Sequence, residues 1–173
     1  MLTRREFVTT AVAAAPVLAA GKQFLVYVGT YTSGGKSKGI EVLRFDASTG
    51  KLSDAELAGE TSNPSFLTIH QNGRHLYAVG ELYDKTKGGG LTAFEIDKST
   101  GKLKELNQVG TRGGGPCHLL VDKTGKNVVV ANYGGGSVAA FPLEADGRVK
   151  EAASYIQHHG SSVDPKRQQA PRA

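Results

Sequence analysis

The sequence contains no tryptophan, one methionine and one cysteine, Cys117, in 173 residues. A single cysteine excludes an internal disulfide, so the fold cannot depend on oxidative cross-links. Beyond the first twenty residues, no window of twelve residues combines helical periodicity with a capping residue, which argues against helices. Glycine, in contrast, is abundant at 23 residues, and 39% of the residues are hydrophobic. Such a composition is typical of a globular, loop-rich domain and excludes a fibrous or disordered chain.

The charge is modest, with a formal net value of +5. Lysine and arginine are scattered through the expected turns and do not gather into one stripe. A nucleic-acid binder usually concentrates its positive charge on one face. We therefore expect no nucleic-acid partner.

The N-terminus has the pattern of an export signal. Arg4 and Arg5 precede the bulky Phe7, and a short apolar run over residues 8–20 follows. The run is shorter than the roughly 20 apolar residues that cross a bilayer, so we expect no stable membrane insertion. The pattern predicts a twin-arginine signal peptide at 1–20 and a periplasmic or extracellular protein. The alternative is an amphipathic N-terminal helix.

An internal repeat of about fifty residues dominates the rest of the chain. Residues 39–52 return without a gap as residues 90–103, 51 positions later, and a looser third copy covers 136–149. A second motif, Asn-Pro-Ser at 63–65, returns as Gly-Pro-Cys at 115–117, 52 positions later. Matches that recur in the same order indicate structural repeats.

Each repeat has the pattern of strands. The short apolar runs 25–28, 76–79 and 128–131 are bounded by turn residues, as buried strands are, while 40–45 and 91–96 partly alternate. About fifty residues and four strands per repeat are typical of a propeller blade. The sequence therefore predicts an all-β fold, a β-propeller of four-stranded antiparallel blades. The expected domain is residues 21–173, with blade 1 at about 24–59, blade 2 at about 63–110, blade 3 at about 115–158 and the start of blade 4 at about 170–173.

Within these blades, the expected strands follow the repeat offsets. The innermost strands are expected at 64–70 and 116–122, the second at 24–30, 75–81 and 126–132, the third at 39–46, 90–97 and 137–143, and the outer ones near 52–58, 103–109 and 149–157. Blade 1 then has no innermost strand. Because known propellers close with four to eight blades, we expect the chain to be the N-terminal part of a longer propeller.

Several stretches at the expected strand ends resemble one family of bacterial propellers. They are residues 28–32 (Val-Gly-Thr-Tyr-Thr), 63–67 (Asn-Pro-Ser-Phe-Leu), 75–81, 115–119 (Gly-Pro-Cys-His-Leu) and 129–138. As a set they resemble the lactonase-family seven-bladed β-propellers of the bacterial 6-phosphogluconolactonase type. The resemblance implies about three of seven blades, hydrolysis of a sugar lactone without a cofactor or metal, and a monomer when complete. It also implies a catalytic histidine beyond residue 173, so we expect this chain alone to be inactive.

Candidate site residues follow from propeller geometry, in which innermost strands begin on the face where ligands bind. His118 lies at such a start and is a candidate base, or a hydrogen-bonded structural residue. The second strands end at Thr30, Glu81 and Asn132, where the chemistry differs between repeats; these are candidate substrate-binding residues, although strand ends and turns also use such side chains. Residues 112–115 (Arg-Gly-Gly-Gly) are typical of a glycine-rich turn, although Arg112 could reach an anionic substrate.

Two further features have plainer interpretations. Cys117 could act as a nucleophile, but no paired His/Asp pattern accompanies it, which favours a small buried residue. The basic, glycine-rich loop at 85–90 could hold a phosphate, but it lacks the Lys-Ser/Thr ending of a phosphate-binding loop. The competing function is a non-catalytic exported propeller that serves as a binding or surface scaffold.

Overall fold

The computed structural model describes residues 23–84, 88–164 and 166–173. The expected signal peptide at 1–20 lies outside these residues, as do positions 85–87 of the basic loop. Within the described residues there is no helix, so the expected all-β fold is confirmed.

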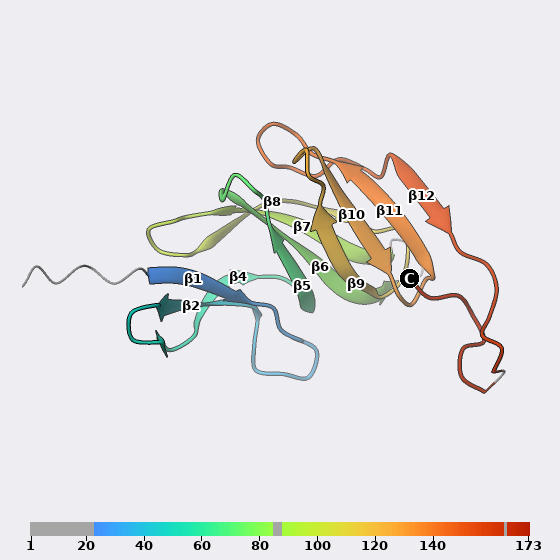
Figure 1. Ribbon diagram of the computed structural model, residues 1–173, viewed down its shortest axis with the longest axis horizontal. Coiled ribbons are helices and arrows are strands. Elements are labelled where there is room, and N and C mark those ends of the chain that lie inside the picture. The colour runs from blue at the N-terminus through green and yellow to red at the C-terminus, as the bar shows by residue number, and fades with distance from the viewer. Residues whose placement is uncertain (1–22, 85–87, 165) are drawn as a thin grey trace, which may run out of the picture.

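Three antiparallel sheets stand side by side, with the sheet of β5–β8 between the other two (Figure 1). In the middle sheet β5 (Pro64–Ile69), β6 (His75–Asp84), β7 (Gly88–Ile96) and β8 (Leu103–Gly110) follow one another from edge to edge. The third sheet repeats this order with β9 (Pro116–Val121), β10 (Asn127–Asn132), β11 (Ser137–Pro142) and β12 (Ser154–Gln157). The order is that of four-stranded propeller blades, as the repeats predict.

The first sheet begins one strand later in the pattern. β1 (Gln23–Val28) pairs with β2 (Gly39–Asp46), and β2 pairs in turn with β3 (Lys51–Leu52) and β4 (Glu56–Glu60). By the repeat offsets, β1 corresponds to the second strands β6 and β10. Among the described strands, none pairs with the other edge of β1.

The middle sheet lies between the other two, which explains why residues 76–79 of β6 are all apolar. Successive side chains of a strand point to opposite faces. Leu76 and Ala78 of β6 therefore pack toward the first sheet with Ile40, while Tyr77 and Val79 pack toward the third. Both faces are covered, so β6 shows no alternation of polar and apolar residues.

Two outer strands differ from the sequence expectation. The strand expected near 52–58 is split into β3 and β4, because the Ser53 hydroxyl accepts the Arg44 amide hydrogen at 2.9 Å and interrupts the ladder. The strand expected near 149–157 is regular only from Ser154. Upstream, Asn107 of the neighbouring sheet bonds both backbone groups of Val149, with its Nδ2 donating at 2.7 Å and its Oδ1 accepting at 3.0 Å.

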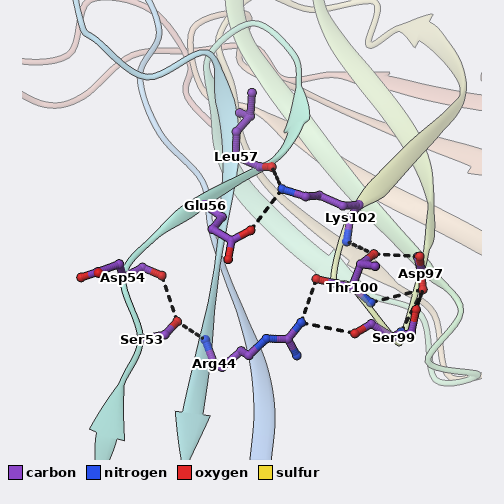
Figure 2. Close-up of polar contacts among 9 residues, drawn as sticks. All are labelled: Arg44, Ser53, Asp54, Glu56, Leu57, Asp97, Ser99, Thr100 and Lys102. Atoms are coloured by element: carbon purple, nitrogen blue, oxygen red, sulfur yellow. Dashed lines mark hydrogen bonds and ion pairs between the residues drawn. The ribbon is translucent and has the colours of Figure 1, made fainter.

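A polar clamp joins the outer parts of the first and second sheets (Figure 2). The Arg44 guanidinium donates to the carbonyl oxygens of Ser99 and Thr100 at 3.3 and 3.1 Å, and Lys102 Nζ donates to the Leu57 carbonyl at 2.8 Å. The receiving turn is held by the Asp97 carboxylate, which accepts the Ser99 and Thr100 hydroxyls. These bonds hold the pKa of Asp97 well below its usual range.

A histidine lies in the seam between the second and third sheets. His75 is 9% exposed, and its Nδ1 is 3.2 Å from Nδ2 of the Asn72 side chain. The His75 ring leaves no room for a side chain at residue 147, which is glycine. Beside it, the Tyr77 hydroxyl donates to the Gly147 carbonyl at 3.0 Å, and burial raises the pKa of Tyr77 to about 12. The seam thus accommodates a neutral imidazole.

We expect this seam to weaken in mild acid. Burial, assisted by His70 and Arg74, lowers the pKa of His75 below its usual 6.5, and Glu95 and Asp146 oppose the shift only in part. The unfolded chain therefore binds a proton first, and the free energy of unfolding should fall as the pH drops from 6.5 through the lower, folded pKa. Urea unfolding from about pH 7.5 to about pH 5 measures this, with His75→Gln as the control that should flatten the dependence. An equally steep fall in the variant would contradict the assignment.

Candidate active site

The connection that follows β1 and the end of β6 each lie against the start of the next sheet. The Asn63 side-chain oxygen, just before β5, accepts the backbone amides of Thr32 and Ser33 at 2.9 and 3.0 Å. The Gly115 amide, just before β9, donates to the Leu82 carbonyl at 2.8 Å. These contacts gather the second-strand ends and the starts of β5 and β9 on one face, which we call the channel face.

Glu81 lies on the channel face at the blade 1–blade 2 boundary. Its Oε2 accepts the Tyr31 hydroxyl at 2.7 Å, and this bond is the main reason that the pKa of Tyr31 is raised. Glu81 is half-buried, whereas Tyr31 is 61% exposed. The structure therefore places a carboxylate and a phenol together where ligand hydroxyl groups could reach both.

Thr30 and Asn132, at the equivalent strand ends, are engaged within the fold. The Thr30 hydroxyl donates to the Gly39 carbonyl at 2.6 Å. Asn132 is fully buried and its Nδ2 donates to the Thr111 carbonyl at 3.0 Å and the Ser137 hydroxyl at 3.1 Å. Both side chains tie connections together. Their substrate-binding roles stay predictions.

His118 is exposed on the inner strand β9, and its ring lies against Phe66 of β5 with the centroids 4.4 Å apart. This ring contact joins the two inner strands β5 and β9. The role of His118 as a base stays a prediction. Cys117, beside it, is half-buried, and its sulfur is 4.0 Å from the Ala131 carbonyl oxygen. Arg112 lies away from the inner strands, and its guanidinium is 5.0 Å from the centre of the ring of Tyr155 in the outer strand β12.

Sequence reasoning missed the tyrosines of this face. Tyr31 lies after β1, Tyr83 near the end of β6 and Tyr133 directly after β10, and they are 61%, 64% and 50% exposed. The signal was present in the sequence, because a tyrosine follows the end of each expected second strand (24–30, 75–81 and 126–132) within one or two residues. The repeat offsets point to the strand ends, where the chemistry differs between repeats, and not to the tyrosines beyond them.

No cluster of three or more His, Cys, Asp or Glu side chains suited to a metal occurs in residues 23–84, 88–164 and 166–173. In the same part of the chain, no helix is long and apolar enough to cross a membrane.

Comparison with known proteins identifies the family. A family model described as "Lactonase, 7-bladed beta-propeller" matches residues 25–173. The chain is 37% identical over 139 residues to a 6-phosphogluconolactonase of Bacillus subtilis, covering 80% of this chain and 38% of that protein. The structure of the Pseudomonas aeruginosa periplasmic gluconolactonase superposes with a TM-score of 0.76 at 34% identity, covering 84% of this chain and 41% of that one.

A second curated relative, a 6-phosphogluconolactonase of Formosa agariphila, is 33% identical over 141 residues, with 80% of this chain and 39% of that protein covered. The chain thus spans about two fifths of the length of these relatives. The family match extends over all three sheets. The chain therefore belongs to the lactonase family of seven-bladed β-propellers.

Proposed function

We propose that these blades contribute to an enzyme that hydrolyses a sugar lactone. The match of residues 25–173 to lactonase propellers carries this proposal, and the relatives' names supply the substrate class, a gluconolactone with or without a phosphate. The channel face supports it, since Glu81 and His118 place polar, hydrogen-bonding groups beside the inner strands.

The chemistry requires three steps. A general base removes a proton from water while the water oxygen attacks the lactone carbonyl carbon. Hydrogen-bond donors or cations stabilise the oxyanion that forms. The ring C–O bond then breaks, and the ring oxygen takes a proton to leave as an alcohol, which gives the open aldonic acid. In this chain we assign Glu81 to binding substrate hydroxyl groups and His118 to lining the channel.

We further propose that the general base is supplied by the remaining blades. The family has seven blades, and the chain covers 38% of the Bacillus subtilis relative. Residues 25–173 joined to the remaining blades of that relative, here called the completed protein, should hydrolyse six- or five-membered sugar lactones without added metal. The 173-residue chain should give no rate above the uncatalysed reaction. Loss of lactone carbonyl absorbance or proton release measures both.

His118→Ala in the completed protein should lower kcat/KM by less than about tenfold, because a channel-lining group differs from a general base, whose loss typically costs ~10²–10⁴-fold. A larger loss would make His118 the base. If the folded completed protein leaves a panel of lactones untouched, hydrolysis is wrong and the non-catalytic binding propeller takes its place.

We also propose export through the twin-arginine route, based on Arg4 and Arg5 before the apolar run. Replacing both by lysine keeps the charge but removes the pair that defines a twin-arginine signal. Cell fractionation should then find the variant retained in the cytoplasm, while the unaltered chain is exported. Export of the Lys-Lys variant at the normal rate would rule this route out.

A further inference from the structure

The three equivalent second-strand ends differ in what their side chains contact. Thr30 bonds to the Gly39 carbonyl of the strand that follows it, and Asn132 bonds to Ser137 of its own hairpin. Glu81 instead reaches the preceding blade, where its carboxylate accepts the Tyr31 hydroxyl at 2.7 Å. The one charged side chain of the three is therefore directed between two blades on the channel face.

A third polar group lies at the same point. Ser65 is the bulged residue of β5 between Pro64, which pairs with Gly80, and Phe66, which pairs with Val79, so it lies across the ladder beside the residue that precedes Glu81. Its hydroxyl opposes the rise of the Tyr31 pKa that Glu81 causes. Its own hydroxyl oxygen is buried, and within the described residues it has no hydrogen-bond partner of acceptable geometry. A buried hydroxyl without a partner is unfavourable, so this position favours a ligand or water that can bond to it.

We propose that Tyr31, Glu81 and Ser65 form a subsite that binds adjacent hydroxyl groups of a neutral sugar lactone; this deepens the proposed function and rests on it. The carboxylate accepts hydrogen bonds from ligand hydroxyls, and the two hydroxyl side chains can donate or accept. The negative charge of Glu81 disfavours an anionic group at this point. The subsite therefore takes the polyol part of the lactone, rejects a phosphate, and binds the neutral lactone in preference to the aldonate product.

Binding of a stable analogue to the 173-residue chain tests this. The probe is glucono-δ-lactam, in which a ring nitrogen replaces the ring oxygen and resists hydrolysis, and its titration is followed by NMR. We expect saturable binding, weakened about tenfold or more by Glu81→Gln, because hydrogen bonds to a charged group are the stronger kind. Tyr31→Phe should weaken binding several-fold, and gluconate should bind less well than the lactam.

Tyr133→Phe is the matched control, because Tyr133 follows the equivalent strand of the third sheet and stacks under Arg172. It should bind the lactam as the unaltered chain does. Thermal melting of each variant separates a lost ligand contact from a lost contact between blades. Unchanged lactam affinity in both Glu81→Gln and Tyr31→Phe, or no saturable binding by the unaltered chain, would overturn the subsite.

The same substitutions in the completed protein separate the subsite from the function. If Glu81→Gln does not change the rate of hydrolysis, the subsite is wrong and the lactonase proposal is unaffected. If lactam binding depends on Glu81 but the completed protein hydrolyses no lactone, the lactonase proposal is wrong and the subsite is retained.

Discussion

Replacing Phe141 by alanine should lower the free energy of unfolding by about 3–5 kcal/mol, as large-to-small changes of buried aromatic residues do. Phe141 is 0% exposed and packs with Tyr77, Leu119 and Val128 in the core between the second and third sheets. Its removal leaves a cavity that β-strands fixed by ladder hydrogen bonds cannot close. Urea unfolding of the variant and the unaltered chain measures the difference.

Phe24→Ala is the control, because Phe24 is 47% exposed on the edge strand β1 and should cost less than about 1 kcal/mol. Hydrogen exchange adds a spatial readout. Since the first sheet packs through a separate cluster that contains Ile40 and Phe94, Phe141→Ala should weaken amide protection in the third sheet before the first. Equal unfolding free energies for Phe141→Ala and Phe24→Ala would contradict the assigned core.

Gly89→Ala should destabilise the chain by roughly 3 kcal/mol through overpacking. Gly89 is buried where β7 begins, and a Cβ there would overlap the ring of Pro116 at the start of β9 and lie 2.7 Å from the Gly80 carbonyl oxygen. Strand pairing holds both Gly80 and Pro116 in place, so neither residue can move away from the added Cβ at low energetic cost. Urea unfolding gives the size of the effect.

Gly50→Ala separates this overlap from backbone strain. Gly50 has a φ of 70°, and a Cβ there meets no atom within 4 Å, so only the conformational cost of about 1–2 kcal/mol applies. We expect Gly89→Ala to be clearly the more damaging. If the two variants melt alike, the close packing of the second sheet on the third is wrong.

The sequence predicted the fold well because the blades repeat. Seven of the expected strands in the second and third blades coincide with β5, β6, β7, β8, β9, β10 and β11 within about three residues at each end, since the same apolar runs and turns recur at a constant offset. The failures occur in two outer strands, where a side chain takes backbone groups out of the ladder, in one case from the neighbouring sheet. Nothing in the local sequence shows that Asn107 will take the backbone groups of Val149, because that contact joins positions 42 residues apart.

The candidate site was predicted only in part for a related reason. The repeat offset located Glu81 and Asn132 at equivalent strand ends, but both are polar and the sequence cannot show which one is buried. The structure places Asn132 fully inside and Glu81 against Tyr31. The pairing of Tyr31 with Glu81 could not be predicted from the sequence, because the two residues belong to different blades and their contact depends on how the sheets pack.

A crystal structure of the completed protein with glucono-δ-lactam bound tests the central claim, that the channel face binds a sugar lactone, most directly. The account predicts the lactam at the channel mouth beside the starts of β5 and β9, with a ring hydroxyl within hydrogen-bond distance of the Glu81 carboxylate. Lactam bound on the opposite face, near the turns that join β5 to β6 and β9 to β10, would contradict it.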